Sequence, residues 1–334
     1  VNTEEYIAIY NEAATADNRD VITPEVAATF ADINHLESIF QTAPVQNHQV
    51  GVSGGNENSQ YLISGDYFTQ KGIILNSFYD RYSFKANVNS QLSKRIRVTV
   101  NTNFAHTLRN IISNSGDGAS SDKGSVVRYA FFRTPGTPIY KENGDYVDLP
   151  PNPKFLGDGY NPVGLANHFD DKERKYIFLN NALIEIKILE DLVFRSNNGI
   201  NLNIINRKKF YEEWGDRGID APGSAVNSTA INTALTSNNV LEYNKTFNEL
   251  HYFRLLLGYE IIHDKTALHG GSRQNYTQQT ENFRYLDAGI GEQRSYGNAW
   301  EWALTSYFSN LEYICLLYTS PSPRDRTRSR MPSS

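Results

Sequence analysis

The sequence predicts an all-β fold, a partial antiparallel transmembrane β-barrel of about nine strands with a short helical segment before it. Three observations lead to this prediction. Apolar and polar residues alternate strictly along several segments, and the connections between these segments alternate between short and long. No apolar run approaches the roughly 18 to 20 residues that a spanning helix needs, which excludes a helical membrane protein.

The first 44 residues differ from the rest of the chain. The segment NTEEYIAIYNEA has the spacing of a short helix, and Pro24 followed by VAATFADI indicates a second one. No charged and apolar leader follows Val1, so we expect no signal peptide and interpret the chain as an internal fragment of a longer protein. Residues 1–44 are expected to end a preceding domain, and residues 45–314 to form the barrel wall.

The clearest strands are predicted between residues 78 and 101. Tyr82, Phe84 and Val88 fall on one face of a strand, and Lys85 and Asn87 fall on the other. The next strand repeats this pattern, with apolar residues at positions 96, 98 and 100. Such alternation is typical of a sheet with one apolar and one polar face. A soluble sandwich would bury the apolar face, whereas a membrane barrel would turn it toward lipid.

The connections favour the barrel over the sandwich. The predicted turns and loops are 54–58, 70–78, 91–94, 106–173, 189–191, 207–244, 263–265 and 275–292, and a ninth strand is predicted at 293–310. Short and long connections alternate in this order. Because a meander places every second connection at the same end of the sheet, one end carries the turns and the other the long loops, as in outer-membrane barrels.

The composition is compatible with such a barrel. Mean hydropathy is low, at −0.52, but a barrel strand shows lipid only at every second residue, so a low value is expected. The 21 Tyr and 17 Phe suit the aromatic girdles of barrel interfaces. The net charge of −5 argues against a nucleic-acid partner.

Residues 315–334 break the β pattern. They read CLLYTSPSPRDRTRSRMPSS and contain the only Cys and the only Met of the chain. This segment resembles the read-through translation of a sequencing-library adapter, so we expect a tail that is foreign to the native protein. A native, disordered basic tail is the alternative.

Residues that could carry chemistry form no recognisable constellation. The seven histidines show no HExxH spacing, and no phosphate-binding glycine loop or nucleophile elbow is present. Asp170 and Asp171 are adjacent carboxylates, but neighbours on a strand point to opposite faces and cannot act as a catalytic pair. The sequence predicts no catalytic, cofactor or metal site, and the chain is not expected to be an enzyme.

The polar faces of the predicted strands supply the candidate binding residues. Their amide and charged groups would line a lumen and hydrogen-bond hydroxyl-rich or peptide solutes, although any water-filled barrel is polar inside. The substrate-binding candidates are Asn87, Asn89, Arg97, Asn101 and Arg254. Further inward candidates are Lys85, Asn103, Asn201, Asn203 and Glu260. The predicted lipid-facing residues are Tyr82, Phe84, Val88, Val98, Val100, Phe253, Leu255, Leu257 and Ile261. Loop aromatics that would stack on sugar rings or pack the loops are Tyr140, Tyr146, Tyr160, Tyr211 and Trp214.

One segment of about sixty residues carries the motifs of a known family. It opens with Asn47 and the SGG of residues 53–55, continues with Y-x-x-S-x-x-Y-x-x-Q-x-G-I-I at 61–74, and closes with R-Y-S-x-x-x-N-x-x-S at 81–90. Gly51 stands where the family usually has Ser, and Asn34 and His35 stand where it usually has Asp-Trp. With these two departures, the segment resembles the first barrel strands of SusC/RagA-type TonB-dependent outer-membrane transporters of the Bacteroidetes.

The resemblance implies a specific assembly. It implies a barrel of about 22 strands plugged by an N-terminal domain, a SusD-like surface lipoprotein as partner, and energy from a TonB complex through an N-terminal segment that this chain lacks. It also implies import of glycans, or of oligopeptides, across the outer membrane. A soluble β-rich glycan-binding module and an enzyme remain as alternatives of other classes.

Overall fold

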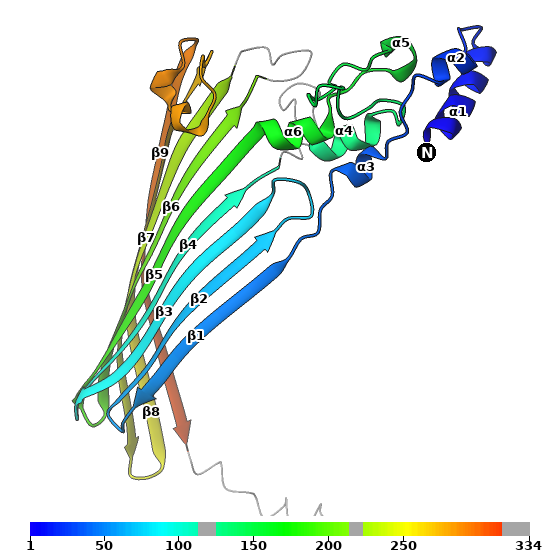
Figure 1. Ribbon diagram of the computed structural model, residues 1–334. Helices are drawn as coiled ribbons and strands as arrows, with labels where there is room; N and C mark the ends of the chain where they lie inside the picture. The colour runs from blue at the N-terminus through cyan, green and yellow to red at the C-terminus, as the bar shows by residue number, and fades with distance from the viewer. Residues whose placement is uncertain (113–124, 214–222, 316–334) are drawn as a thin grey trace, which may run out of the picture.

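The computed structural model describes residues 1–112, 125–213 and 223–315, and it is built around one antiparallel sheet of nine strands in sequence order. The strands are β1 (Val45–Gly55), β2 (Ser59–Lys71), β3 (Phe78–Ser93), β4 (Ile96–Asn110), β5 (Phe169–Leu189), β6 (Leu192–Tyr211), β7 (Ser224–Phe247), β8 (His251–Gln274) and β9 (Gln293–Cys315). In Figure 1 the sheet curves, with β1 to β5 in front and the lower parts of β8 and β9 behind. This curved meander has the form of part of a barrel wall, which confirms the predicted fold class.

The two ends of the sheet differ in their connections. The short connections 56–58, 94–95, 190–191 and 248–250 lie at one end, here called the turn end (Figure 1). The connections 72–77, 111–168, 212–223 and 275–292 lie at the other end, here called the loop end. The alternation of short and long connections is therefore confirmed.

Two predicted connections are wrong. The predicted loop at 207–244 contains most of β7, and the predicted tight turn at 263–265 lies inside the unbroken strand β8. β7 is rich in Asn, Ser and Thr on both faces, so it lacks the alternation that identifies a strand. The turn between β7 and β8 is formed by Asn248 and Glu249, whose φ angles of 50° and 58° are positive without a glycine. One missed strand and one divided strand offset each other in the predicted count.

The predicted end of the ninth strand is also wrong. β9 does not turn after residue 310 but continues to Cys315, which pairs with His251 of β8. Leu311 and Tyr313 pair with Leu255 and Phe253, so the apolar spacing of the strand extends to its end. Apart from Cys315, the predicted foreign tail lies outside the described residues.

A helical body lies beside the loop end of the sheet (Figure 1). It contains α1 (Thr3–Ala16), α2 (Pro24–Ala27), α3 (His35–Ser38), α4 (Val126–Phe132), α5 (Pro153–Leu156) and α6 (Pro162–His168). Ile39, Val126 and Ala166 belong to its buried core, so the first 40 residues pack against the connection between β4 and β5. The backbone bonds Ala31 N to Gly136 O and Ile33 N to Pro135 O, both 3.0 Å, join the same two parts. No helix in the described residues is long and apolar enough to cross a membrane.

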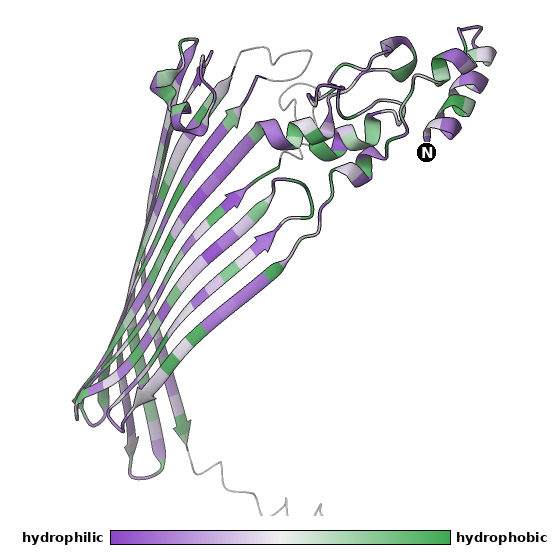
Figure 2. Ribbon diagram, in the orientation of Figure 1, coloured by the Kyte–Doolittle hydropathy of each residue, from purple (hydrophilic) through white to green (hydrophobic). Residues whose placement is uncertain are grey.

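The strand register sorts the side chains onto two faces, because directly paired residues of antiparallel strands point to the same side. All residues predicted to face lipid share the face of Tyr82, here called the apolar face. All inward candidates share the face of Asn87, here called the polar face. Figure 2 shows hydrophobic and hydrophilic residues alternating along the strands. The first set lies on β3, β4 and β8 and the second on β3, β4, β6 and β8, and each keeps to one face.

A row of aromatic rings crosses the apolar face from β1 to β5. His48, Tyr67, Tyr82, His106 and Tyr176 pair in register, and each ring stacks on the next with centroid separations of 6.4, 4.9, 6.3 and 4.5 Å. Aromatic rings of this amphipathic kind concentrate at membrane–water interfaces. The row, here called the aromatic row, is the feature expected of a barrel girdle.

β9 departs from this division of the faces. Trp300, Trp302 and Leu304 pair with Thr266, Asp264 and Ile262, which places the tryptophans on the polar face. Glu301, between them, lies on the apolar face, where His263 Nε2 is 2.7 Å from its carboxylate and Lys265 Nζ is 3.4 Å away. At β9 the two faces therefore exchange some of their character.

Candidate functional site on the polar face

Asparagine side chains gather on the polar face at the middle of the sheet. Asn87 of β3 pairs directly with Asn101 of β4, Asn101 pairs with Asn181 of β5, and Asn181 pairs with Gly199 of β6. Because all four positions share one face, the amides of the three asparagines form a continuous row across neighbouring strands. Each amide has both donors and acceptors, so the row can bind uncharged polar groups that donate hydrogen bonds and ones that accept them.

Two adjoining hollows lie over this row. One encloses about 430 Å³ and is lined by residues that include Lys85, Asn103 and Asn201, and the other encloses about 530 Å³ and includes Gln60 and Thr99. Both hollows are lined by Asn87 and Asn101. We call the combined surface the amide groove.

Gly199 opens the floor of the amide groove. A Cβ atom at this position would lie 2.6 Å from Thr236 Oγ1, so any side chain there would displace the threonine. Beside it, Asn203 Nδ2 donates to Asn201 Oδ1 at 2.7 Å, which fixes one amide of the wall. Asn103 Oδ1 is buried and has no hydrogen-bond partner among the described residues. The groove therefore combines fixed amides with an acceptor that has capacity left.

A second feature of the polar face is a chain of cross-strand ion pairs, here called the ion-pair ladder. Arg195 Nε donates to Glu185 at 3.0 Å, and Arg195 also bonds Glu242. Arg254 Nε donates to Glu242 at 2.9 Å and lies 3.9 Å from Glu312. Glu242 is buried between the two arginines, with 6% of its surface exposed. The ladder ties β5 to β9 below the amide groove, toward the turn end.

Comparison with known proteins shows which proteins this chain resembles. No family model matches the chain. The chain is 28% identical over 286 residues to the TonB-dependent receptor P3 of Formosa agariphila, which covers 85% of this chain and 28% of that protein. It is 23% identical over 314 residues to the TonB-dependent receptor SusC of Bacteroides thetaiotaomicron, covering 86% of this chain and 29% of that protein. A solved structure of the RagAB peptide transporter superposes with a TM-score of 0.76 at 17% identity, covering 94% of this chain and 38% of that one.

The chain fits a SusC/RagA-like TonB-dependent receptor. The family resemblance found in the sequence motifs is thereby confirmed, and the RagAB superposition supports the same fold. The chain spans less than a third of the length of the two curated receptors named above.

The structure brings most of the predicted site residues of this chain together. Asn87, Asn89 and Asn101 all line the amide groove. Arg97 lies on the same face nearer the turn end, where it donates to Gln91 at 2.9 Å and pairs in register with Glu185. Arg254 lies four strands from Asn101, in the ion-pair ladder. Arg254 is therefore held by carboxylates and does not line the groove.

Sequence reasoning missed several contributors to the amide groove, among them one from β5 and one from β6. Asn181 of β5 and Gly199 of β6 enter it only because of the strand register. Asn181 stands among apolar residues in FLNNALIEI, and its neighbour Asn180 points to the other face, so the sequence pattern is ambiguous there. The register of β5 with β4 and β6 decides the face of Asn181, and the sequence of β5 alone does not contain it.

The loop aromatics mostly contact one another. The rings of Tyr140 and Tyr146 are 5.2 Å apart, those of Tyr129 and Tyr160 are 5.2 Å apart, and Tyr211 lies 4.5 Å from the ring of Phe169. These contacts fit the loop-packing alternative. Trp214 lies outside the described residues.

The acidic residues at the loop end form ion pairs on separate faces. Asp170 bonds Arg284 on the apolar face, whereas Asp171 accepts from Arg207 Nη2 at 2.5 Å on the polar face. Burial raises the pKa of the Glu212 carboxyl, but the hydrogen bond from His168 and the charge of Arg284 outweigh it and hold this pKa below its usual value. Within residues 1–112, 125–213 and 223–315, no three potential metal ligands come together.

Proposed function

We propose that this chain is part of a receptor that imports oligosaccharides, or oligopeptides, across the outer membrane with energy from a TonB complex. The observation that carries the proposal is the separation of the two faces. An amide groove lies on one face, and the aromatic row and the apolar residues of β3, β4 and β8 lie on the other. A barrel that turns the apolar face to lipid has the amide groove on its inner wall.

In this proposal the parts of the chain have distinct roles. Residues 1–44 end the plug region, residues 45–314 form part of the barrel, and residues 315–334 are foreign to the receptor. The partners are a SusD-like surface lipoprotein and the TonB complex. No nucleic acid, cofactor or catalytic step is involved, and the similarity to receptors and transporters supports a role other than that of an enzyme.

The chemistry of the amide groove suits neutral, hydrogen-bonding solutes. Side-chain amides donate and accept without net charge, so they match the hydroxyl groups of a glycan and equally the backbone of a peptide. SusC is among the similar receptors, and RagAB is described as a peptide transporter. Side-chain amides do not discriminate between glycan hydroxyls and peptide groups. Both solute classes are therefore tested.

The test compares two variants of the intact receptor in cells. Asn87→Ala combined with Asn101→Ala removes two adjoining amides from the groove, and uptake of a labelled oligosaccharide or a labelled oligopeptide should fall by about tenfold. Val98→Ala, on the apolar face of β4 and outside the lining of both hollows, is the control and should leave uptake unchanged. Equal uptake by the parent and the double variant for both solute classes would overturn the proposal.

A further inference from the structure

A large cavity lies on the apolar face at the loop end. It encloses about 980 Å³ over β5 to β8, and the connection 275–292 covers it through Glu281, Arg284 and Tyr285. The cover is anchored where Tyr276 packs against Phe210 and Ala225. This cavity, here called the rim cavity, lies on the opposite side of the sheet from the amide groove.

The apolar face becomes basic and polar at the rim cavity. In register across β5, β6 and β7, Tyr176, Ile204 and Ile231 form an apolar row. Two residues further toward the loop end, about 7 Å along each strand, the row is Arg174, Asn206, Thr229 and His269. The next row contains Lys172, Lys208 and Asn227. On β5 and β6 the face thus changes from apolar residues to Arg174, Lys172 and Lys208 within two rows.

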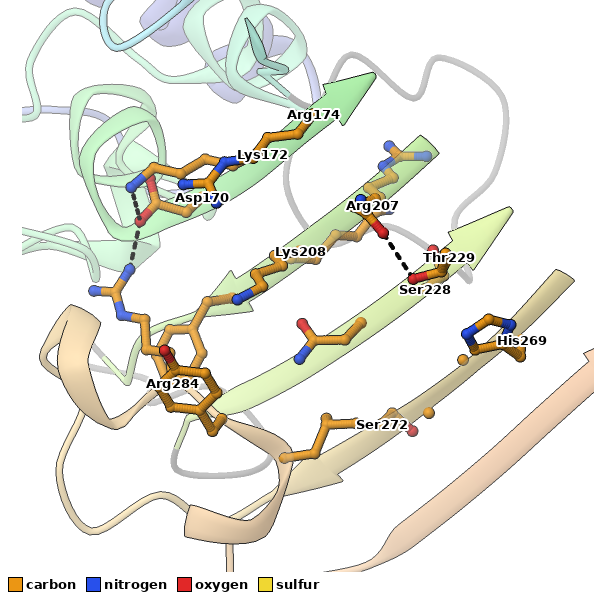
Figure 3. Close-up of a pocket in the computed structure, with 18 of the residues that line it drawn as sticks. Asp170, Lys172, Arg174, Arg207, Lys208, Ser228, Thr229, His269, Ser272 and Arg284 are labelled. Atoms are coloured by element: carbon orange, nitrogen blue, oxygen red, sulfur yellow. Dashed lines mark hydrogen bonds and ion pairs between the residues drawn. The ribbon is translucent and has the colours of Figure 1, made fainter. Parts of the chain in front are cut away.

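Some of these cations are already neutralised. Lys172 Nζ is 2.9 Å from Glu281 and 3.7 Å from Asp170, and Arg284 bonds both Asp170 and Glu212. These pairs hold the cover to the sheet (Figure 3).

Two other basic groups of the rim cavity form no ion pair with a carboxylate of the described residues. Among the described residues, Arg174 and Lys208 have no carboxylate partner, and Lys208 Nζ lies 5.0 Å from the ring centroid of Tyr285. Figure 3 shows these side chains on neighbouring strands of the cavity floor, with His269 on β8. Thr229 Oγ1 donates to Asn206 Oδ1 at 2.9 Å, which leaves the Asn206 amide hydrogens available as donors. Arg174 feels the charge of Glu281 across the cavity but is not ion-paired with it. The cavity therefore presents two cations without a direct ion pair beside an amide donor.

We propose that the rim cavity binds the phosphorylated headgroup of a lipid in the adjoining leaflet. The proposal rests on the proposed function, because it needs the apolar face to meet lipid. A lipid whose acyl chains contact Tyr176, Ile204 and Ile231 has its phosphate at the height of Arg174 and Lys208. Clustered Lys and Arg at this height are a recognised means of binding anionic headgroups. A transported solute on the inner wall does not reach this side of the sheet.

The test measures lipid retention by the intact receptor in vesicles. Phosphatidylcholine vesicles with a minor fraction of phosphatidic acid supply the probe, and native mass spectrometry counts the phosphatidic acid that stays bound after extraction. Arg174→Gln with Lys208→Gln should weaken retention by roughly thirtyfold, because each basic residue near an anionic surface contributes about fivefold. Lys175→Gln removes a charge from the next residue of β5 on the opposite face and should retain lipid like the parent.

Three outcomes would overturn the headgroup site. They are unchanged retention in the double variant, an equal loss in Lys175→Gln, and full displacement of the lipid by inorganic phosphate at the same concentration. The last outcome would show a site for free phosphate. Solute uptake by the parent receptor is measured separately with the groove variants, so failure of the headgroup site is distinguishable from failure of the proposed import.

Discussion

Val98 and Thr99 are consecutive residues of β4 whose side chains point to opposite faces. Val98 shares the apolar face with Ile184 and Tyr259, whereas Thr99 shares the polar face with Asn89. In the intact receptor Val98→Arg places a charge in the lipid band and should cost about 2 to 4 kcal/mol of folding free energy near the midplane. Thr99→Arg should fold like the parent. The folded fraction in lipid vesicles, read by gel mobility without heating, checks both.

The pair of variants is its own control, because the substituted residue is the same and the positions are adjacent. If both variants fold equally well, the apolar face does not meet lipid, and the barrel orientation has to be abandoned. If only Thr99→Arg loses folding, the face of Thr99 meets lipid and the assignment of the two faces is reversed.

Glu242 is the central acid of the ion-pair ladder. Its side chain is 8% exposed, and it binds Arg195 and Arg254 from two neighbouring strands. Glu242→Ala leaves both guanidinium groups without this partner and should lower the unfolding free energy by about 1 to 3 kcal/mol. Glu190→Ala, which removes a pair between Lys187 and an acid that is 89% exposed, should cost less than about 1 kcal/mol. Urea unfolding in vesicles compares the free energies of unfolding of the two variants. Similar losses would show that the buried ion pairs of Glu242 stabilise the fold no more than an exposed pair does.

At the scale of elements, α3 is held to the connection after β4 by a buried histidine. His35 is 3% exposed, and its Nε2 lies 3.2 Å from Thr134 O. Burial and the nearby charge of Arg133 lower the pKa of His35 to about 4, from 6.5. The folded state therefore binds this proton less readily than the unfolded state, so stability is retained above pH 6.5 and is lost as the pH falls toward 4. Between pH 7.5 and pH 5 the loss is about 2 kcal/mol.

Protonation of His35 should open the contact between α3 and the connection after β4, and hydrogen exchange measures this opening locally. Amides of α3 and of residues 134–137 should exchange faster at pH 5 than the intrinsic pH dependence explains, while the strands remain protected. His35→Gln should remove most of the excess, and His48→Gln, an exposed substitution on β1, should leave it unchanged. If the extra exchange at pH 5 persists in His35→Gln, protonation of another group causes the opening.

The elements that the sequence predicts well are those whose own residues carry the pattern. β3 and β4 alternate apolar and polar residues along most of their length, so their existence and faces follow from the sequence. β7 does not alternate, since Thr229, Thr233 and Ser237 occupy its apolar face, and it is a strand because β6 and β8 pair with it. Its turn at Asn248 and Glu249 lacks the glycine that usually marks a two-residue hairpin.

At the scale of the whole molecule, the candidate site was predictable only in part. Asn87, Asn89 and Asn101 follow from two adjacent, well-patterned strands. The rest of the amide groove depends on register across β5 and β6, and the rim cavity depends on how the connection 275–292 folds back over the sheet. Neither relation is local in sequence, so periodicity could not show them.

The sheet has two edges, β1 and β9, and neither has an outer partner in the described chain. In hydrocarbon an open edge leaves backbone N–H and C=O groups without hydrogen bonds, each at a cost of several kcal/mol. The isolated chain of 334 residues should therefore form no defined pore in a planar bilayer, and should associate through its edges instead. Single-channel recordings test this directly: irregular or absent conductance is expected, and a reproducible unit conductance from the isolated chain would show that these strands close a barrel without further ones.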